Sequence, residues 1–375
     1  MSGGLYIHIP FCAAKCPYCD FVSFAGRTGQ DMDAYVRALE NEMALWKDEA
    51  VSTDTVFFGG GTPTLLGADR LVRLLEAAVE HFHLLPDAEI TLEANPNTIS
   101  GPMLQKLYRG GFNRISFGAQ SFSGALLSTL GRIHGPDEIK EGVLSAADAG
   151  FENISLDLMF GLPGQHLKDV EYDMEEALRL PLRHLSYYSL KVEEETPFYR
   201  WQREGKLALA DEDLERDMAA LIHDRLTAAG FDHYEISNFA VPGRASRHNL
   251  HYWRNEPYVG LGCAAHGRWK NLRYAHAADL DGYMKGVAER KRMPVTQEAI
   301  DPRDDAFETL MMGLRLAEGI DIRQIEKRTG LEVAGSWIPI AERHAQRGFV
   351  TLEGCRIRPT LKGWDVQNSW LVDYL

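Results

Sequence analysis

The alternation of short β-rich runs with longer helical segments constrains the fold of this chain more than any other feature. Six runs rich in β-branched and aromatic residues lie in the first two hundred residues, at 5–9, 55–60, 89–94, 114–120, 153–161 and 184–190. Between them, apolar residues recur at helical spacing, at 31–49, 69–83, 101–109, 136–149 and 167–179. Six consecutive β–α units predict a parallel sheet with right-handed crossovers. An open doubly wound sheet and a partial barrel are equal alternatives, and both place their chemistry at the C-terminal ends of the strands.

The chain divides into three predicted regions. Residues 1–200 form the β–α core. Residues 201–300 are less regular, with a helix near 211–229, and extend the core. Residues 301–375 show a helix–helix–hairpin order that resembles a winged-helix module. DNA binding is not expected of this module, because its twelve acidic and ten basic side chains offer no basic recognition face.

Composition limits the possible partners and the compartment. The 375 residues carry a net charge of −14, which argues against non-specific nucleic-acid binding, because that binding depends on Lys and Arg. We expect no membrane span, since no apolar run reaches about 18 residues. A β-rich run starts almost at the first residue, so we expect no signal peptide and a cytoplasmic protein.

Three cysteines lie within eight residues, Cys12, Cys16 and Cys19, in a chain with only two others, Cys263 and Cys355. The spacing C-x3-C-x2-C suits a [4Fe–4S] cluster, whose irons prefer thiolate sulfur. Three thiolates leave one iron without a protein ligand, and an open position suggests a place for a substrate or cofactor. The alternatives are a zinc site completed by a distant histidine, and three unrelated buried thiols.

The motif "CAAKCPYC" after a first strand resembles that of the radical S-adenosylmethionine enzymes. In that superfamily, S-adenosylmethionine chelates the fourth iron and is cleaved to a radical. "LYIHIPFC", "FFGGGTPT", "LEANP", "SFGAQSF", "GRIH" and "DLMFGLPGQ" resemble, in the same order, the family of oxygen-independent coproporphyrinogen III dehydrogenase. The resemblance covers essentially the whole chain. It implies a partial (βα)6 barrel with a small winged-helix-like C-terminal domain.

Several polar and glycine residues follow the predicted strands. A strand-end carboxylate could bind an ammonium or a ribose hydroxyl, and an arginine could hold a carboxylate. Taken singly, each is better explained as a surface or capping residue, and the glycines as a tight turn. The resemblance implies that together they bind S-adenosylmethionine: Tyr6, Tyr18, Gly60, Gly61, Thr62, Glu93, Gln120, Arg132 and Asp157.

Two features depart from the dehydrogenase pattern. Phe21 stands where that pattern has a fourth cysteine, and the long N-terminal arm is missing. Both put oxidative decarboxylation of coproporphyrinogen III in doubt, and no catalytic residue is assigned.

The segment "RHNLHYW" (247–253) offers imidazole ligands and aromatic surface, which suit haem. From chemistry alone, a structural role for these histidines is favoured. The segment also resembles the haem-binding motif of the haem-chaperone branch of the family, which implies that haem is bound by His248, Asn249, His251, Tyr252 and Trp253. His248 is the first candidate ligand and His251 the second, and whether the segment is extended or helical stays open.

Three functions of different class follow. The preferred one is a haem chaperone that carries a [4Fe–4S] cluster and S-adenosylmethionine, accepts electrons from a donor and delivers haem to an acceptor protein. The alternative is the dehydrogenase. A zinc-stabilised structural protein is a distant third.

Overall fold

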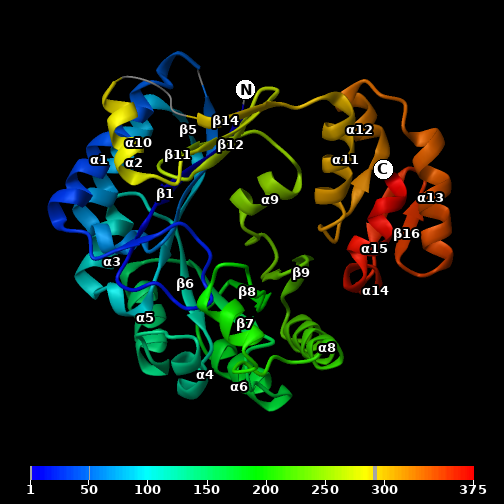
Figure 1. Ribbon diagram of the computed structural model, residues 1–375, viewed down its shortest axis with the longest axis horizontal. Coiled ribbons are helices and arrows are strands. Elements are labelled where there is room, and N and C mark those ends of the chain that lie inside the picture. Colours follow the sequence, from blue (N-terminus) through cyan, green and yellow to red (C-terminus); the bar gives the residue numbers. More distant parts are fainter. Residues whose placement is uncertain (1, 50, 290–293) are drawn as a thin grey trace.

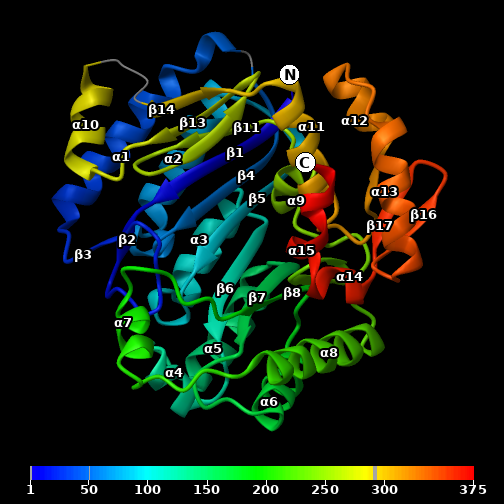
Figure 2. The same cartoon turned by 45° about the vertical axis from the view of Figure 1, so that its right-hand side comes forward.

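The computed structural model describes residues 2–49, 51–289 and 294–375. Six parallel strands form its centre: β1 (Ser2–Ile9), β4 (Ser52–Gly60), β5 (His83–Ala94), β6 (Arg114–Gln120), β7 (Asn153–Phe160) and β8 (His184–Ser189). Each strand pairs with the next one along the chain, so the order never reverses as it does in a doubly wound sheet. Figure 2 shows the six strands side by side in this order. The partial (βα)6 barrel is therefore confirmed, and the open doubly wound alternative is wrong.

Helices connect these strands and lie together on the outer side of the sheet (Figure 1). They are α1 (Gly29–Ala44), α2 (Ala68–His81), α3 (Gly101–Arg109), α4 (Gly124–Thr129), α5 (Pro136–Ala149) and α6 (Leu167–Leu178). The predicted ranges 101–109 and 136–149 are confirmed residue for residue. The helix expected over 31–49 begins earlier, because Thr28 and Asp31 form a capping box, and it ends at Ala44 before a 3₁₀ turn at Lys47–Glu49.

The middle of the chain widens this sheet at both edges. Its elements are α7 (Pro197–Arg203), α8 (Glu212–Ala228), β9 (Asp232–Glu235), β10 (Asn238–Ala240), α9 (Arg247–Trp253), β11 (Tyr258–Leu261), β12 (His266–Trp269), β13 (Leu272–His276), α10 (Leu280–Ala288) and β14 (Pro294–Ala299). Strand β11 joins β1 in parallel, and β12, β13 and β14 follow antiparallel. Strands β10 and β9 are added antiparallel beyond β8. Among the residues described, the sheet reaches twelve strands.

The C-terminal region has a hydrophobic core of its own, around Leu310, Ile325 and Trp370. Its elements are α11 (Pro302–Gly313), β15 (Ile320–Asp321), α12 (Ile322–Thr329), α13 (Ala334–Gln346), β16 (Val350–Glu353), β17 (Arg356–Pro359), α14 (Leu361–Asp365) and α15 (Gln367–Leu371). The region stands beside the barrel, with α9 between the two (Figure 1). The segment after α11 bonds to β9, through Ala317 N–H to the carbonyl of Tyr234 at 3.0 Å. No helix in the described part of the chain is long and apolar enough to cross a membrane.

Candidate functional site

The three clustered cysteines lie in the loop that follows β1. Strand β2 (Phe11–Cys12) pairs with β3 (Phe24–Ala25), and between them the N–H of Cys19 donates to the carbonyl of Cys16 at 3.1 Å. All three thiols are free and partly exposed. They line one pocket of about 410 Å³ at the C-terminal ends of the barrel strands. The structure therefore brings Cys12, Cys16 and Cys19 together in one pocket wall.

The electrostatics of these thiols fit a shared cationic group. Burial raises the pKa of the Cys19 thiol, and the neighbouring Cys16 and Cys12 raise it further. Bound iron would reverse this shift at Cys19, because the positive charge of a metal favours the thiolate form of its ligands. Within the described ranges, no group of three or more His, Cys, Asp or Glu side chains is placed to hold a single metal ion. Three thiols around one pocket suit a larger cluster.

The turn after β4 holds the cysteine loop in place. Gly61 N–H donates to the carbonyl of Ile9 at 2.9 Å, and Thr62 N–H donates to the carbonyl of Phe11 at 2.7 Å. A Cβ atom on Gly61 would lie 2.6 Å from the carbonyl oxygen of Phe11 and 3.0 Å from Sγ of Cys12. Only glycine fits between this turn and the cysteine loop. Gly61 therefore has a structural role in addition to its predicted contact with the cofactor.

Two partly buried carboxyl groups, Glu93 of β5 and Asp157 of β7, face the same pocket. Burial raises the pKa of Glu93 to about 8, and the negative charge of Asp157 adds to the shift. Burial also raises the pKa of Asp157, against a hydrogen bond of 3.1 Å from Ser116 Oγ. The N–H of Gly60 donates to Oε2 of Glu93 at 3.1 Å. Burial therefore favours the protonated form of Glu93 at neutral pH, and a hydrogen-bond donor beside it would favour the ionised form.

A fixed guanidinium stands opposite these carboxyl groups. Arg132 donates at 2.7 Å both to Oδ1 of Asn95 and to the carbonyl of Gly118, and it lies 3.7 Å from Sγ of Cys16. Gln120 adopts a φ of +70° at a bulge of β6 and also lines the pocket. Asn95 was not predicted as a site residue, although it stands two positions after Glu93 in the "LEANP" motif.

Tyr6 alone among the predicted cofactor residues does not line this pocket. Its hydroxyl bonds to Nδ1 of His8 at 2.9 Å, and its ring stacks on Phe57 and His248, with ring centroids 6.1 and 6.4 Å apart. Tyr6 therefore connects the cysteine side of the barrel with helix α9.

The 247–253 segment is helical, which settles the question that its sequence left open. His248 is 1% exposed and stacks on Phe57, with the ring centroids 5.1 Å apart. Its Nδ1 bonds to Thr55 Oγ1 and its Nε2 to the hydroxyl of Tyr252, both at 2.8 Å. Burial lowers the pKa of His248 to about 3. This imidazole is neutral, and both of its nitrogens are engaged.

His251 lies on the same helix in a different electrostatic state. Its Nε2 is 2.8 Å from Asp54 and its Nδ1 is 2.7 Å from Glu256. Burial alone would lower its pKa, but these two carboxylates outweigh burial and raise it to about 9. His251 is therefore protonated at neutral pH, and its ion pairs with Asp54 and Glu256 hold α9 in place.

The two other residues of the predicted haem motif lie on the same helix. Trp253 packs under the guanidinium of Arg315, 5.6 Å from the ring centroid, and Asn249 is partly buried.

Comparisons with known proteins agree with this architecture. A family model of the radical SAM superfamily matches residues 6–177, and a model of the HemN C-terminal domain matches residues 300–366. The solved structure of coproporphyrinogen III oxidase (HemN) from Escherichia coli, which its title calls a radical SAM enzyme, superposes with a TM-score of 0.85. That comparison covers 99% of this chain and 89% of the other at 23% identity, so it shows the fold alone.

Curated relatives match along most of the chain. A protein of Lactococcus lactis named heme chaperone HemW is 40% identical over 99% of this chain and 96% of its own length. Its namesake in Bacillus subtilis is 37% identical over 92% of both chains. Another in Escherichia coli is 40% identical over 87% of this chain and 86% of the relative. This chain belongs to the HemW family of the radical SAM superfamily.

Proposed function

We propose that this protein is a haem chaperone, which binds haem and transfers it to an acceptor protein. The observation that carries the proposal is the 40% identity to HemW of Lactococcus lactis across 99% of the chain. Oxidative decarboxylation of coproporphyrinogen III is not favoured, because the similarity to the oxidase is one of fold. Phe21, in the place of the dehydrogenase's fourth cysteine, is 63% exposed at the cysteine pocket and offers no ligand there.

Membership of the radical SAM superfamily implies a [4Fe–4S] cluster and S-adenosylmethionine. We assign the cluster to Cys12, Cys16 and Cys19, whose thiols line one pocket. When bound, such a cluster supplies an electron for cleavage of the sulfonium. The cluster therefore also needs an electron donor.

The rest of this pocket suits S-adenosylmethionine. Arg132 is held in place by Asn95 and Gly118 and would bind the carboxylate of S-adenosylmethionine. Glu93 and Asp157 offer acceptors for an ammonium group and for ribose hydroxyls. The remaining predicted contacts that line the pocket are Tyr18, Gly60, Gly61, Thr62 and Gln120. Tyr6, the remaining predicted contact, lies outside the lining of this pocket.

For haem we keep His248 as the first candidate ligand and His251 as the second, with Asn249, Tyr252 and Trp253 around them. Ligation through Nε2 of His248 requires the hydroxyl of Tyr252 to move away, which costs about 1 kcal/mol. Thr55 would then still bond to Nδ1 and orient the ring, as hydrogen-bond partners of metal-ligating histidines do. His251 must first lose its proton, which costs about 3 kcal/mol at pH 7 when the pKa is about 9. His248 is therefore the easier ligand.

The test is a haemin titration of the anaerobically reconstituted protein, followed by the Soret band. We expect the parent to bind about one haem with the spectrum of an imidazole ligand, and His248→Ala to change that spectrum. The Cys12→Ala variant is the control that shows whether haem binding requires the cluster. A parent protein that shows no saturable Soret shift would contradict the proposal.

A further inference from the structure

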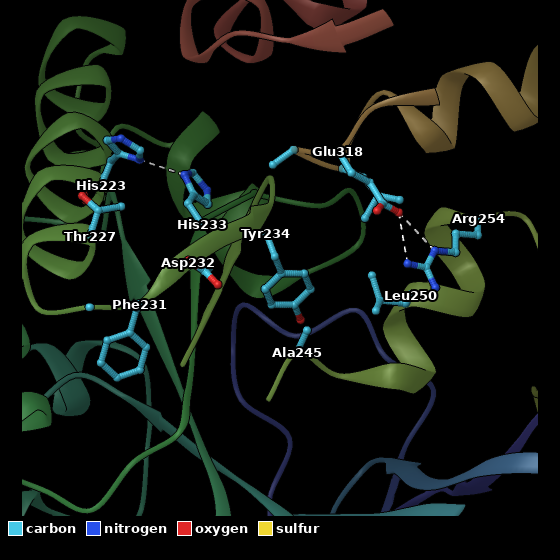
Figure 3. A pocket seen from close by; sticks show the side chains of 13 residues that line it. His223, Thr227, Phe231, Asp232, His233, Tyr234, Ala245, Leu250, Arg254 and Glu318 are labelled. Carbon is cyan, nitrogen blue, oxygen red and sulfur yellow. Dashed lines mark hydrogen bonds and ion pairs between the residues drawn. The ribbon is translucent and has the colours of Figure 1, made fainter. Parts of the chain in front are cut away.

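A pocket of about 710 Å³ lies on the side of α9 that faces away from its buried histidines (Figure 3). One wall is formed by Leu250 of α9 and by Arg254, which directly follows that helix. The opposite wall is formed by His223 of α8 and His233 of β9, and Leu316 and Glu318 come from the segment after α11. The volume falls within the range of about 300–1,000 Å³ that is usual for sites of cofactors and other small ligands. Nothing in the proposed cluster or cofactor chemistry uses this pocket.

The two histidines of the pocket are hydrogen-bonded to each other. Their Nδ1 atoms lie 3.0 Å apart, and Figure 3 shows the rings meeting on one side of the pocket. The Nε2 of His233 lies 3.4 Å from the carbonyl of Ile236. Burial lowers the pKa of His233 to about 4, with a further contribution from His223, so His233 is neutral.

These contacts fix the tautomers of the pair. A carbonyl oxygen only accepts, so Nε2 of the neutral His233 carries its hydrogen and Nδ1 carries a lone pair. His223 must therefore donate from its own Nδ1, and when neutral it keeps a lone pair on Nε2. Within the described part of the chain, no side chain or backbone group bonds to that Nε2. A lone pair on one ring nitrogen, with the other nitrogen donating to a neighbour, is the state in which histidines ligate metals.

The remaining walls suit a flat apolar ring with acidic edges. Leu250 and Leu316 give the pocket apolar surface. Outside the lining, His233 stacks on Phe239 at a centroid distance of 4.0 Å and meets the edge of Trp364 at 4.9 Å, and these contacts hold its ring in place. Across the pocket, Arg254 is paired with Glu318 at 3.0 Å. The pair is about half exposed, so a ligand carboxylate could replace Glu318 with little loss.

We propose that this pocket binds haem, with Nε2 of His223 as the axial ligand and Arg254 as the partner of a propionate. The inference rests on the proposed function, because that function makes haem the cargo. Both ring nitrogens of His248 are hydrogen-bonded, and His251 is protonated. His223 uses only Nδ1 in its bond to His233, so its Nε2 can bind iron without the loss of a hydrogen bond. His223 therefore serves as the entry ligand, and α9 separates it from the histidines of the motif. His233 is a positioning residue.

The experiment compares haemin titrations of the full-length parent with those of His223→Ala, His233→Phe and Thr227→Trp. His223→Ala should weaken binding at least tenfold and change the Soret spectrum. His233→Phe keeps the stacking surface but removes the acceptor of His223, so it should weaken binding less and alter the spectrum. Thr227 lies one turn after His223 on α8 and lines the pocket, so the tryptophan should fill it and block haem without removing a ligand.

The matched control is His83→Ala, which removes an exposed histidine of β5 far from this pocket and should bind haem like the parent. Parent-like titrations of both His223→Ala and Thr227→Trp would overturn the inference and leave the proposed function intact. A parent protein that binds no haem would overturn both. Far-ultraviolet circular dichroism of each variant separates loss of a ligand from loss of the fold.

Discussion

Binding of S-adenosylmethionine should tighten as the pH rises from 6.0 to 7.5, because Glu93 must ionise to accept a donor. With a pKa of about 8 for Glu93, the ionised fraction rises from about 1% to about 24% over that interval. The apparent dissociation constant scales inversely with this fraction, so it should fall by about 20-fold. A negatively charged cluster beside the pocket would raise the pKa further and leave the direction unchanged.

Isothermal titration calorimetry of the reconstituted protein at the two pH values measures this change. Glu93→Gln should bind more weakly and lose the pH dependence. Asp157→Asn should reduce the dependence, because it removes the neighbouring charge that helps to raise the pKa of Glu93. Equal affinity of the parent protein at both pH values would refute the reasoning. So would a Glu93→Gln variant whose dissociation constant changes with pH as much as that of the parent.

Three further predictions concern the cluster, the glycine turn and α9. Changing Cys12, Cys16 or Cys19 to Ala should abolish iron uptake on anaerobic reconstitution, measured by iron analysis. The controls Cys263→Ala and Cys355→Ala should retain about four irons per cluster. Iron retention in any of the first three variants would contradict the assignment. Gly61→Ala should lower the iron content because its Cβ would meet the carbonyl of Phe11, while Gly124→Ala, which has no atom within 4 Å of the added Cβ, should leave it unchanged. The folded-state pKa of His251 is raised to about 9, so its pairing stabilises the fold fully below pH 6.5, by about 3 kcal/mol, and is lost as the pH rises through 9. Urea unfolding at pH 6 and pH 9.5 should show this loss in the parent and a smaller one in Asp54→Asn; equal losses would count against the pairing.

The barrel could be predicted from sequence because its signals are local. Strand and helix periods alternate six times along the sequence. The helix ends were less predictable, since the capping box of Thr28 and Asp31 starts α1 before the expected residue 31. Helix α13 escaped prediction, and the proline at position 339 inside it explains why, since proline usually ends a helix. The choice between a barrel and a doubly wound sheet depends on strand order, which periodicity does not encode.

The candidate site was predictable only in part. Glu93, Arg132 and Asp157 follow or lie on neighbouring strands, so topology alone brings them to one edge of the sheet. The state of His248 depends instead on Thr55, 193 positions away in the chain. The pairing of His223 with His233 likewise requires α8 to pack beside β9. Such contacts between elements set the tautomers and pKa values, and no local pattern reports them.

The most direct test of the account offers the anaerobically reconstituted protein haem and coproporphyrinogen III side by side, with S-adenosylmethionine and a reductant present. The chaperone function predicts saturable haem binding, with a Soret shift, and no protoporphyrinogen IX by chromatography. Conversion of coproporphyrinogen III to protoporphyrinogen IX, without saturable haem binding, would contradict it.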